Sequence, residues 1–163
     1  MSNLYFVGGI FEPSCYKFYI NNSAGIVQNA ANVYQSNLLK GMDHVFPEGV
    51  KVVSLPFIGS YPSRFKKIFL GSKKTKIFNN SLVIRLGFLN LSIVKLFSRF
   101  TSLFSFILKE KITSKEAIII YSMHLPFVAA IVLARFISKR KYKIYIIVPD
   151  LPEYMSDRTD FIY

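Results

Sequence analysis

The sequence has a single cysteine and few acidic residues. Cys15 is the only cysteine among 163 residues, which excludes an internal disulfide framework and favours a reducing compartment. Only 9 residues are acidic against 21 lysines and arginines, so the net charge is +12. Four of the acids lie in the last fourteen residues, which leaves the rest of the chain more basic still. This excess of positive charge favours a polyanionic partner: nucleic acid, anionic lipid headgroups or a phosphorylated substrate.

Several catalytic and binding motifs are absent from the sequence. It contains no CxxC, HExxH, GxSxG or Walker A pattern. Metalloenzymes, hydrolases with a nucleophilic serine and P-loop NTPases therefore lack their sequence signals, and we expect no metal site. No module of interleaved arginines and aromatic residues is present, so we expect no nucleic-acid partner. The first residues do not form a secretory signal peptide, which favours a cytoplasmic location.

No hydrophobic run is suitable for a membrane span, although the mean hydropathy of +0.34 is high. The most apolar window of the length that a span needs, about 20 residues, covers 118–137. It contains His124, Pro126 and Arg135. A strand, a turn and a buried helix explain these interruptions better than a transmembrane helix does. We therefore expect the protein to lie on a membrane rather than to cross it.

Short apolar segments alternate with helical patterns along the chain. Strands are expected at 4–7, 50–55, 82–86, 118–121 and 145–148, and helices at 24–39, 90–111 and 127–136. The first helix would be capped by Asn21, Asn22 or Ser23 and would end at Gly41. This order predicts an α/β fold, a Rossmann-like, doubly wound parallel sheet that forms one domain over residues 1–163.

Two segments each allow two interpretations of their polar residues. The helix at 24–39 carries amides that suit either a solvated surface or a wall facing a ligand: Gln28, Asn29, Asn32 and Gln35. The loop at 57–76 is rich in cations and suits either a flexible solvated surface or an anion-binding or membrane-facing loop.

The helix expected at 90–111 has a wide apolar stripe rich in phenylalanine. The stripe consists of Ile93, Phe97, Phe100, Phe104 and Ile107. Lys95 and Arg99 belong to the polar positions outside it. Packing of the stripe on the sheet is the simpler interpretation, and a helix that also dips into a bilayer surface is the alternative.

Residues with chemical potential follow three of the expected strands. Gly8 and Gly9 come directly after the first strand, where glycines let the backbone approach a ligand. The third spaced glycine of the dinucleotide fingerprint is missing, which disfavours a Rossmann dehydrogenase. His124 follows the strand at 118–121 and can donate to an oxyanion or a sugar hydroxyl, while Asp150 and Glu153 follow the next strand and can accept from hydroxyls. A structural role for His124 is an equally open interpretation.

Five segments together resemble a known family of enzymes. They are VGGIF (7–11), NNSAGIVQNAANVYQSNLLKGM (21–42), IGSYPSR (58–64), YSMHLPF (121–127) and VPDLPEYM (148–155). In this order and spacing they are similar to the N-terminal half of a GT-B glycosyltransferase, of the family 4 type that acts in bacterial polysaccharide biosynthesis. The resemblance covers nearly the whole chain.

The resemblance implies an enzyme with two Rossmann-like domains, of which this chain is the acceptor side. The substrate would be a nucleotide sugar, with no cofactor, and the acceptor would be lipid-linked or a polysaccharide. Gly8 and Gly9 would approach the donor phosphates, and His124 would be the catalytic residue near the transferred sugar. The acceptor-binding residues would be Tyr61, Arg64, Lys66, Lys67, Asp150 and Glu153.

The donor domain of such an enzyme is absent from this sequence. We therefore expect the chain to be inactive alone, as a truncated gene product, as a fragment, or as a subunit whose partner chain supplies the donor half. The basic loop and the helix rich in phenylalanine would hold it on the anionic inner face of the cell membrane. The alternative is a non-catalytic adaptor that recruits a partner to that surface.

Overall fold

A six-stranded, mostly parallel sheet forms the centre of the protein. The computed structural model describes residues 4–25, 27–78 and 80–149, and the sheet has the order β4-β5-β2-β1-β7-β8. Its central strands, β1 (Leu4–Gly8), β2 (Val50–Ser54) and β7 (Ala117–Tyr121), are rich in buried, β-branched and aromatic residues. Phe6 lies between Val52 and Ile119 in parallel register. Continuous apolar strands of this kind are typical of a sheet covered on both faces.

The outer strands complete the sheet, and one of them corrects the expected topology. β5 (Ser81–Arg85) and β8 (Lys143–Ile147) are parallel to their neighbours, as expected. β4 (Lys73–Ile77) is antiparallel to β5, so the prediction of an entirely parallel sheet is wrong. Its three lysines indicated a loop in the sequence, yet charged residues are well suited to an exposed edge strand. A separate pair, β3 (Phe69–Leu70) and β6 (Phe88–Leu89), was also missed.

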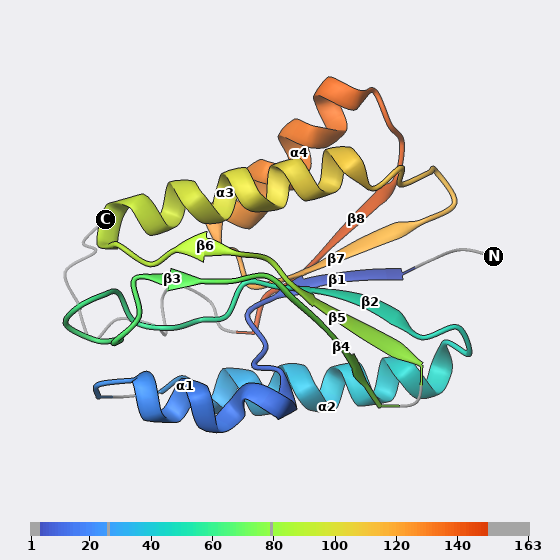
Figure 1. Ribbon diagram of the computed structural model, residues 1–163. Coiled ribbons are helices and arrows are strands. Elements are labelled where there is room, and N and C mark those ends of the chain that lie inside the picture. The colour runs from blue at the N-terminus through green and yellow to red at the C-terminus, as the bar shows by residue number, and fades with distance from the viewer. Residues whose placement is uncertain (1–3, 26, 79, 150–163) are drawn as a thin grey trace, which may run out of the picture.

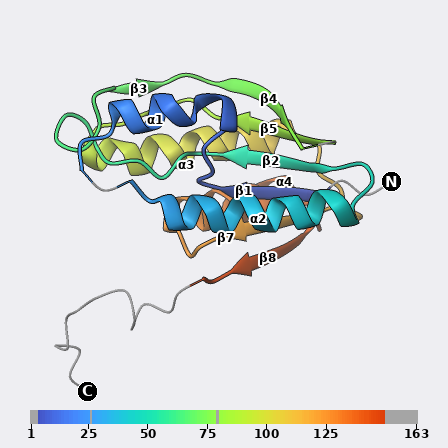
Figure 2. The ribbon, with the colours of Figure 1, turned by 90° about the horizontal axis from the view of Figure 1, so that it is seen from below.

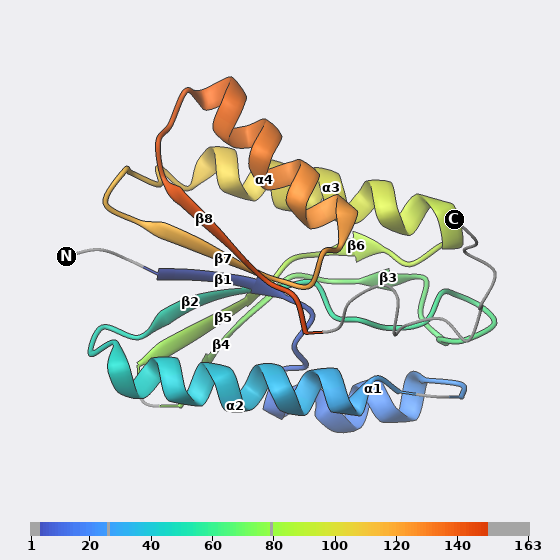
Figure 3. The same ribbon diagram turned by 180° about the vertical axis from the view of Figure 1, so that it is seen from behind.

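Helices cover both faces of the sheet. α1 (Tyr16–Asn22) and α2 (Asn29–Val45) lie on one face, as Figures 1 and 2 show. α3 (Ser92–Lys109) and α4 (Leu125–Ser138) pack against each other on the opposite face (Figure 3). Two apolar clusters fill the spaces between the layers, and the larger one includes residues of α3 and α4 as well as Tyr19 of α1. The chain is therefore an α/β fold with a mostly parallel sheet flanked by helices. Within the described residues, we find no helix with the length and apolar character needed to cross a bilayer.

The first expected helix differs from the structure at both ends. α1 ends at Asn22, and α2 begins only at Asn29. Gly25 lies between them with a φ of +96°, a conformation that glycine adopts without strain and that interrupts a helix. Gly41 does not end the helix, since it lies inside α2, which continues to Val45.

The apolar stripe of α3 faces the core over only part of its length. Ile107 is buried as expected, but Ile93 is 85% exposed and Phe97 is 69% exposed. Arg99, expected on the polar side, is buried with only 3% of its surface exposed. The reason is that the first turns of α3 extend beyond the six-stranded sheet toward β3 and β6, as Figure 1 shows. The apolar periodicity of a helix does not indicate which of its turns pack on the sheet and which extend beyond it.

A buried carboxylate fixes the loop after β1. Glu12 is fully buried, and it accepts a hydrogen bond of 2.5 Å from the hydroxyl of Tyr19 on α1. Its second oxygen lies 3.3 Å from Nη1 of Arg85 at the end of β5. The exits of β1 and β5 are thereby held together beneath α1.

Candidate functional site

The candidate site lies at the carboxyl ends of the central strands. From β1 the chain order runs outward to β2 and β5 on one side and to β7 and β8 on the other, so the topology reverses between β1 and β7. In open α/β sheets, ligands bind outside the carboxyl ends of the strands at this reversal. A cavity of about 570 Å³ is present there, and both exit loops line it, with Phe57 and Ile58 after β2 and His124 after β7. The start of α3 contributes Lys95 and Arg99.

Arg99 is a buried cation without a carboxylate partner among the residues that the structure describes. Its Nη2 donates to the carbonyl of Pro56, and its Nη1 lies 3.3 Å from Nε2 of His124. Its Nε has no hydrogen-bond partner in the described part of the chain. The guanidinium carbon lies 4.7 Å from the centre of the Phe88 ring, a favourable cation–π distance. Burial lowers the pKa of Arg99 to about 10, so the group remains charged at neutral pH.

Lys95 lies one helical turn before Arg99 and is half-buried. Its ammonium donates to the carbonyl of Ile58 at 3.1 Å and to Oγ of Ser60 at 2.8 Å. Burial, followed by repulsion from Arg99 and Arg64, lowers the pKa of Lys95 to about 8. The charge of Arg99 therefore adds to the cost of ionising Lys95 in a partly desolvated cavity.

His124 is a neutral hydrogen-bond donor in this setting. Burial, and then the charges of Arg99 and Lys95, lower the pKa of His124 to about 4. Because a guanidinium can only donate, Nε2 of His124 must accept from Arg99, which places the imidazole proton on Nδ1. Nδ1 has no protein partner within the described ranges, so it is free to donate to a ligand. The ring is held edge-on against Phe127, with centres 4.5 Å apart.

A second, more apolar cavity of about 590 Å³ adjoins the first. Tyr34 of α2 and Tyr121 and Ser122 at the exit of β7 line it. Phe57 and Gln28 line both cavities, so the two share a wall. The edge of the sheet therefore presents a cationic compartment next to an aromatic one.

Gly8, the last residue of β1, and Gly9 are explained by close packing inside the protein. The N–H of Gly9 donates to Oε1 of Gln35 at 2.9 Å. A Cβ at Gly9 would lie 2.3 Å from the ring of Phe57, and a Cβ at Gly8 would lie 2.3 Å from Oε1 of Gln35. Neither glycine lines the two cavities described above. Contact of Gly8 and Gly9 with donor phosphates stays a prediction.

Two of the four amides, Asn32 and Gln35, are neither on a solvated surface nor on a wall facing a ligand. Gln35 is fully buried and Asn32 is 9% exposed. Asn32 accepts a hydrogen bond from the N–H of Phe11, while Gln35 accepts from the N–H of Gly9. These two amides hold the loop after β1, and only Gln28 and Asn29 contribute to a cavity wall.

The predicted acceptor-binding residues are divided by the structure. Arg64 lines the cationic cavity together with His124. Tyr61, Lys66 and Lys67 lie on the same loop but do not line it, and Lys66 donates instead to the carbonyl of Asn21 at 3.2 Å. Asp150 and Glu153 lie outside the described residues.

The sequence interpretation missed Lys95 and Arg99 as site residues. Both were assigned to the solvent face of an amphipathic helix, where charged residues usually lie. The only signal was their spacing of four residues, which places them next to each other on one side of α3. Comparison with models of protein families, with curated protein sequences and with solved structures gives no match for this chain.

Proposed function

We propose that this chain is the acceptor-side half of a glycosyltransferase with a GT-B architecture. In this proposal the sheet is the N-terminal Rossmann-like domain, and a donor domain on another chain or segment closes over its carboxyl edge. The enzyme moves a sugar from a nucleotide-sugar donor to a lipid-linked or polysaccharide acceptor. The observation that carries the proposal is the position of His124, paired with Arg99, in the wall of a cationic cavity at that edge.

The arrangement suits the chemistry of sugar transfer. An acceptor hydroxyl forms a bond to the anomeric carbon, and the bond from that carbon to the diphosphate oxygen breaks with the diphosphate taking the electron pair. The proton of the acceptor hydroxyl passes to an oxygen of the departing diphosphate. Nδ1–H of His124 donates to a hydroxyl or to a developing oxyanion, and the fixed charges of Lys95 and Arg99 stabilise negative charge nearby. No metal or cofactor is part of this proposal, since the nucleotide sugar is the substrate.

The proposal places the enzyme on the cytoplasmic face of an anionic membrane. Support comes from the first turns of α3, where Ile93 and Phe97 are largely exposed. The exposed cations Arg64, Lys66 and Lys67 lie in the loop that leads to β3, next to the same end of α3. Exposed apolar residues beside cations are the combination that binds anionic lipid surfaces.

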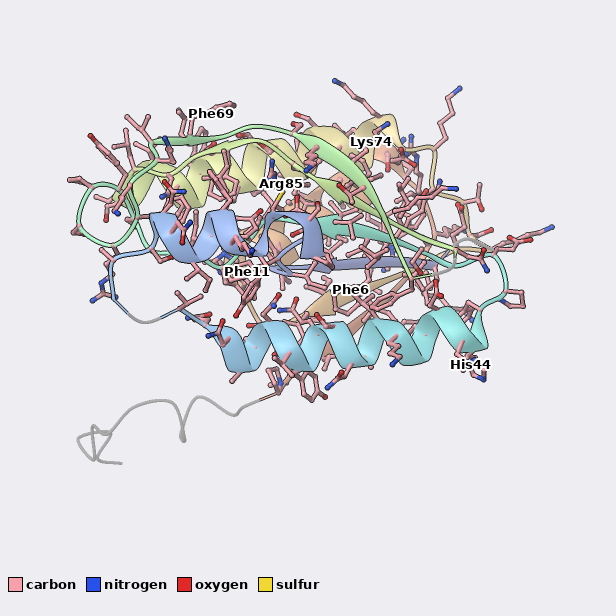
Figure 4. The ribbon with its side chains drawn as sticks, turned by 60° about the horizontal axis from the view of Figure 1, so that its bottom comes forward. Phe6, Phe11, His44, Phe69, Lys74 and Arg85 are labelled. Carbon is pink, nitrogen blue, oxygen red and sulfur yellow. The ribbon has the colours of Figure 1, made fainter. Side chains whose placement is uncertain are left out.

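Sugar transfer by the native assembly tests the proposal. The protein is purified from its native source with its partners and supplied with native membranes and nucleotide sugars labelled in the sugar. His124→Ala should lower the labelling of the acceptor by about a hundredfold or more, the usual effect of losing one preorganised donor. His44→Ala is the matched control, because His44 is the only other histidine and lies at the far end of α2 (Figure 4). Equal labelling by wild type and His124→Ala would contradict the proposal.

A non-catalytic membrane adaptor is the second candidate. The observation that favours it is the exposed apolar start of α3, which can bind a membrane without any chemistry at His124. An adaptor would keep its membrane recruitment of the partner in His124→Ala and would show no sugar transfer in any form.

A further inference from the structure

The cationic cavity holds more positive charge than the described residues neutralise. Lys95, Arg99 and Arg64 all line it, and none of the carboxylates in residues 4–25, 27–78 and 80–149 does. The ion pairs found in the described part of the chain, Lys51 with Glu110 and Arg85 with Glu12, lie elsewhere. A buried guanidinium normally has a charged partner, because removing an ion from water is costly. The cavity therefore has the charge of an anion site.

The cations are held in place by the protein, which distinguishes the cavity from a solvated basic surface. Carbonyls and a hydroxyl of the loop after β2 position both side chains: Pro56 accepts from Arg99, while Ile58 and Ser60 accept from Lys95. Arg99 is 3% exposed and keeps an unpartnered Nε. A flexible surface lysine has neither feature.

We infer that this cavity is a phosphate-binding site, in which Arg99 and Lys95 bind the phosphate oxygens and His124 donates to a neighbouring oxygen. A phosphate offers several acceptor oxygens, which match the donors that the guanidinium of Arg99, the ammonium of Lys95 and the Nδ1–H of His124 supply. A volume of about 570 Å³ is much larger than one phosphate, so the natural ligand is a phosphate ester. The binding claim stands on the cavity alone, and its identification as the acceptor site rests on the proposed function.

The rim of the cavity suggests two sources for such an ester. Leu96 lines the cavity, and Ile93 and Phe97 are exposed on the neighbouring positions of α3. An apolar rim suits a lipid phosphate that stays in a membrane, but a soluble phosphate ester satisfies the same donors. The experiment below separates these sources.

Calorimetric titration with inorganic phosphate at low salt tests the site. Lys95→Met should weaken phosphate binding by about tenfold or more, the usual effect of losing a charged hydrogen bond. Arg99→Met should do the same while keeping an apolar stem in the core. Lys109→Met is the control: it removes the same charge from an exposed position in the last turn of α3 and should change the affinity less than twofold. Circular dichroism confirms that each variant is folded.

A vesicle assay identifies the source of the phosphate. Vesicles with phosphatidic acid are compared with phosphatidylglycerol vesicles of equal surface charge. A preference for phosphatidic acid that Lys95→Met removes supports a lipid phosphate, whereas phosphate binding without this preference supports a soluble ester. No binding of inorganic phosphate and no lipid preference would overturn the inference, as would equal weakening by Lys109→Met. If His124→Ala lost sugar transfer but the wild type did not bind inorganic phosphate, the proposed function would be supported and the phosphate site would be rejected.

Discussion

Arg99 and His124 share a hydrogen bond, and the charge of the arginine determines the state of the histidine. Since the guanidinium occupies Nε2 as a donor, a second proton on His124 would have to replace this bond and lie beside a fixed positive charge. The low pKa of His124, about 4, follows from its burial and from the nearby cations. The histidine is therefore a constant donor over the physiological range rather than a proton shuttle.

This pairing predicts a pH dependence of stability that belongs to His124. Its pKa is lowered on folding from the ordinary value of 6.5 to about 4, so the unfolded chain binds the proton first as the pH falls. The contribution of neutral His124 to the free energy of unfolding should therefore decrease as the pH falls from about 6.5 to about 4. Between pH 7 and pH 5 the decrease should be on the order of 1–2 kcal/mol after allowance for solvent screening. Urea unfolding at the two pH values measures this loss. His124→Gln should reduce the difference, while His44→Gln should leave it unchanged.

At the scale of elements, Gly8 and Gly9 at the end of β1 are in close contact with α2 and with the loop after β2. The loop after β1 donates hydrogen bonds from its backbone N–H groups to the amide oxygens of Gln35 and Asn32, and the ring of Phe57 leaves no room for a side chain at Gly9. Phe57 in turn forms the shared wall of the two cavities. Packing against Gly9 therefore determines the position of Phe57 in the wall of the site.

Alanine substitutions at two glycines should have opposite effects on stability. Gly9→Ala places a Cβ 2.3 Å from the Phe57 ring and should lower the free energy of unfolding by about 1–3 kcal/mol, the usual cost of overpacking. Gly41→Ala should raise it by about 0.5–1 kcal/mol, because Gly41 lies inside α2 with no atom near its added Cβ. Chemical denaturation compares the two. A neutral Gly9→Ala would mean that the Phe57 ring moves aside at little cost and that close packing does not require glycine at this position.

The sequence predicted correctly those strands whose apolar residues match their buried positions in the sheet. β1, β2, β5 and β7 were found because buried parallel strands are continuously apolar. β4 was missed because its lysines, which suit an exposed edge, have no strand signal of their own. The place of His124 after β7 was predicted because a strand exit is identifiable in a sequence, while its catalytic role stays a prediction. Arg99 was not found as a site residue, because its burial depends on the distant Pro56 and Phe88, which no local pattern reveals.

At the scale of the whole molecule, apolar and basic residues gather at the end where α3 begins. Phe69 of β3 pairs with Leu89 of β6, and both are exposed, as are Ile93 and Phe97 of α3. Figure 4 shows Phe69 at the opposite end of the molecule from His44. The cationic cavity lies beside this end, since Lys95 and Leu96 of its lining are neighbours of Phe97. A membrane bound here would bring lipid headgroups to the cavity.

Binding to anionic vesicles should accordingly contain a part that depends on salt and a part that does not. The net charge of +12 gives attraction that is screened between about 50 mM and 200 mM salt. Insertion of Ile93 and Phe97 is a hydrophobic contribution that salt does not screen, and each fully buried side chain adds about 1.5–3 kcal/mol. The double variant Ile93→Ser with Phe97→Ser should therefore lose the binding that remains at high salt. Vesicle sedimentation measures both parts.

The control for this loss is Val45→Ser, because Val45 is also 69% exposed but ends α2 on the other face of the sheet. It should bind vesicles like the wild type at every salt concentration.

Duplex DNA is a polyanion that has no apolar interior into which Ile93 and Phe97 could insert. Binding of the protein to DNA should therefore disappear at the higher salt concentration even for the wild type. If DNA binding persisted there while vesicle binding did not respond to the α3 variant, the basic surface would belong to a nucleic-acid partner and the membrane proposal would be wrong. If vesicles bound at neither salt concentration, the exposed start of α3 would instead have to be covered by protein.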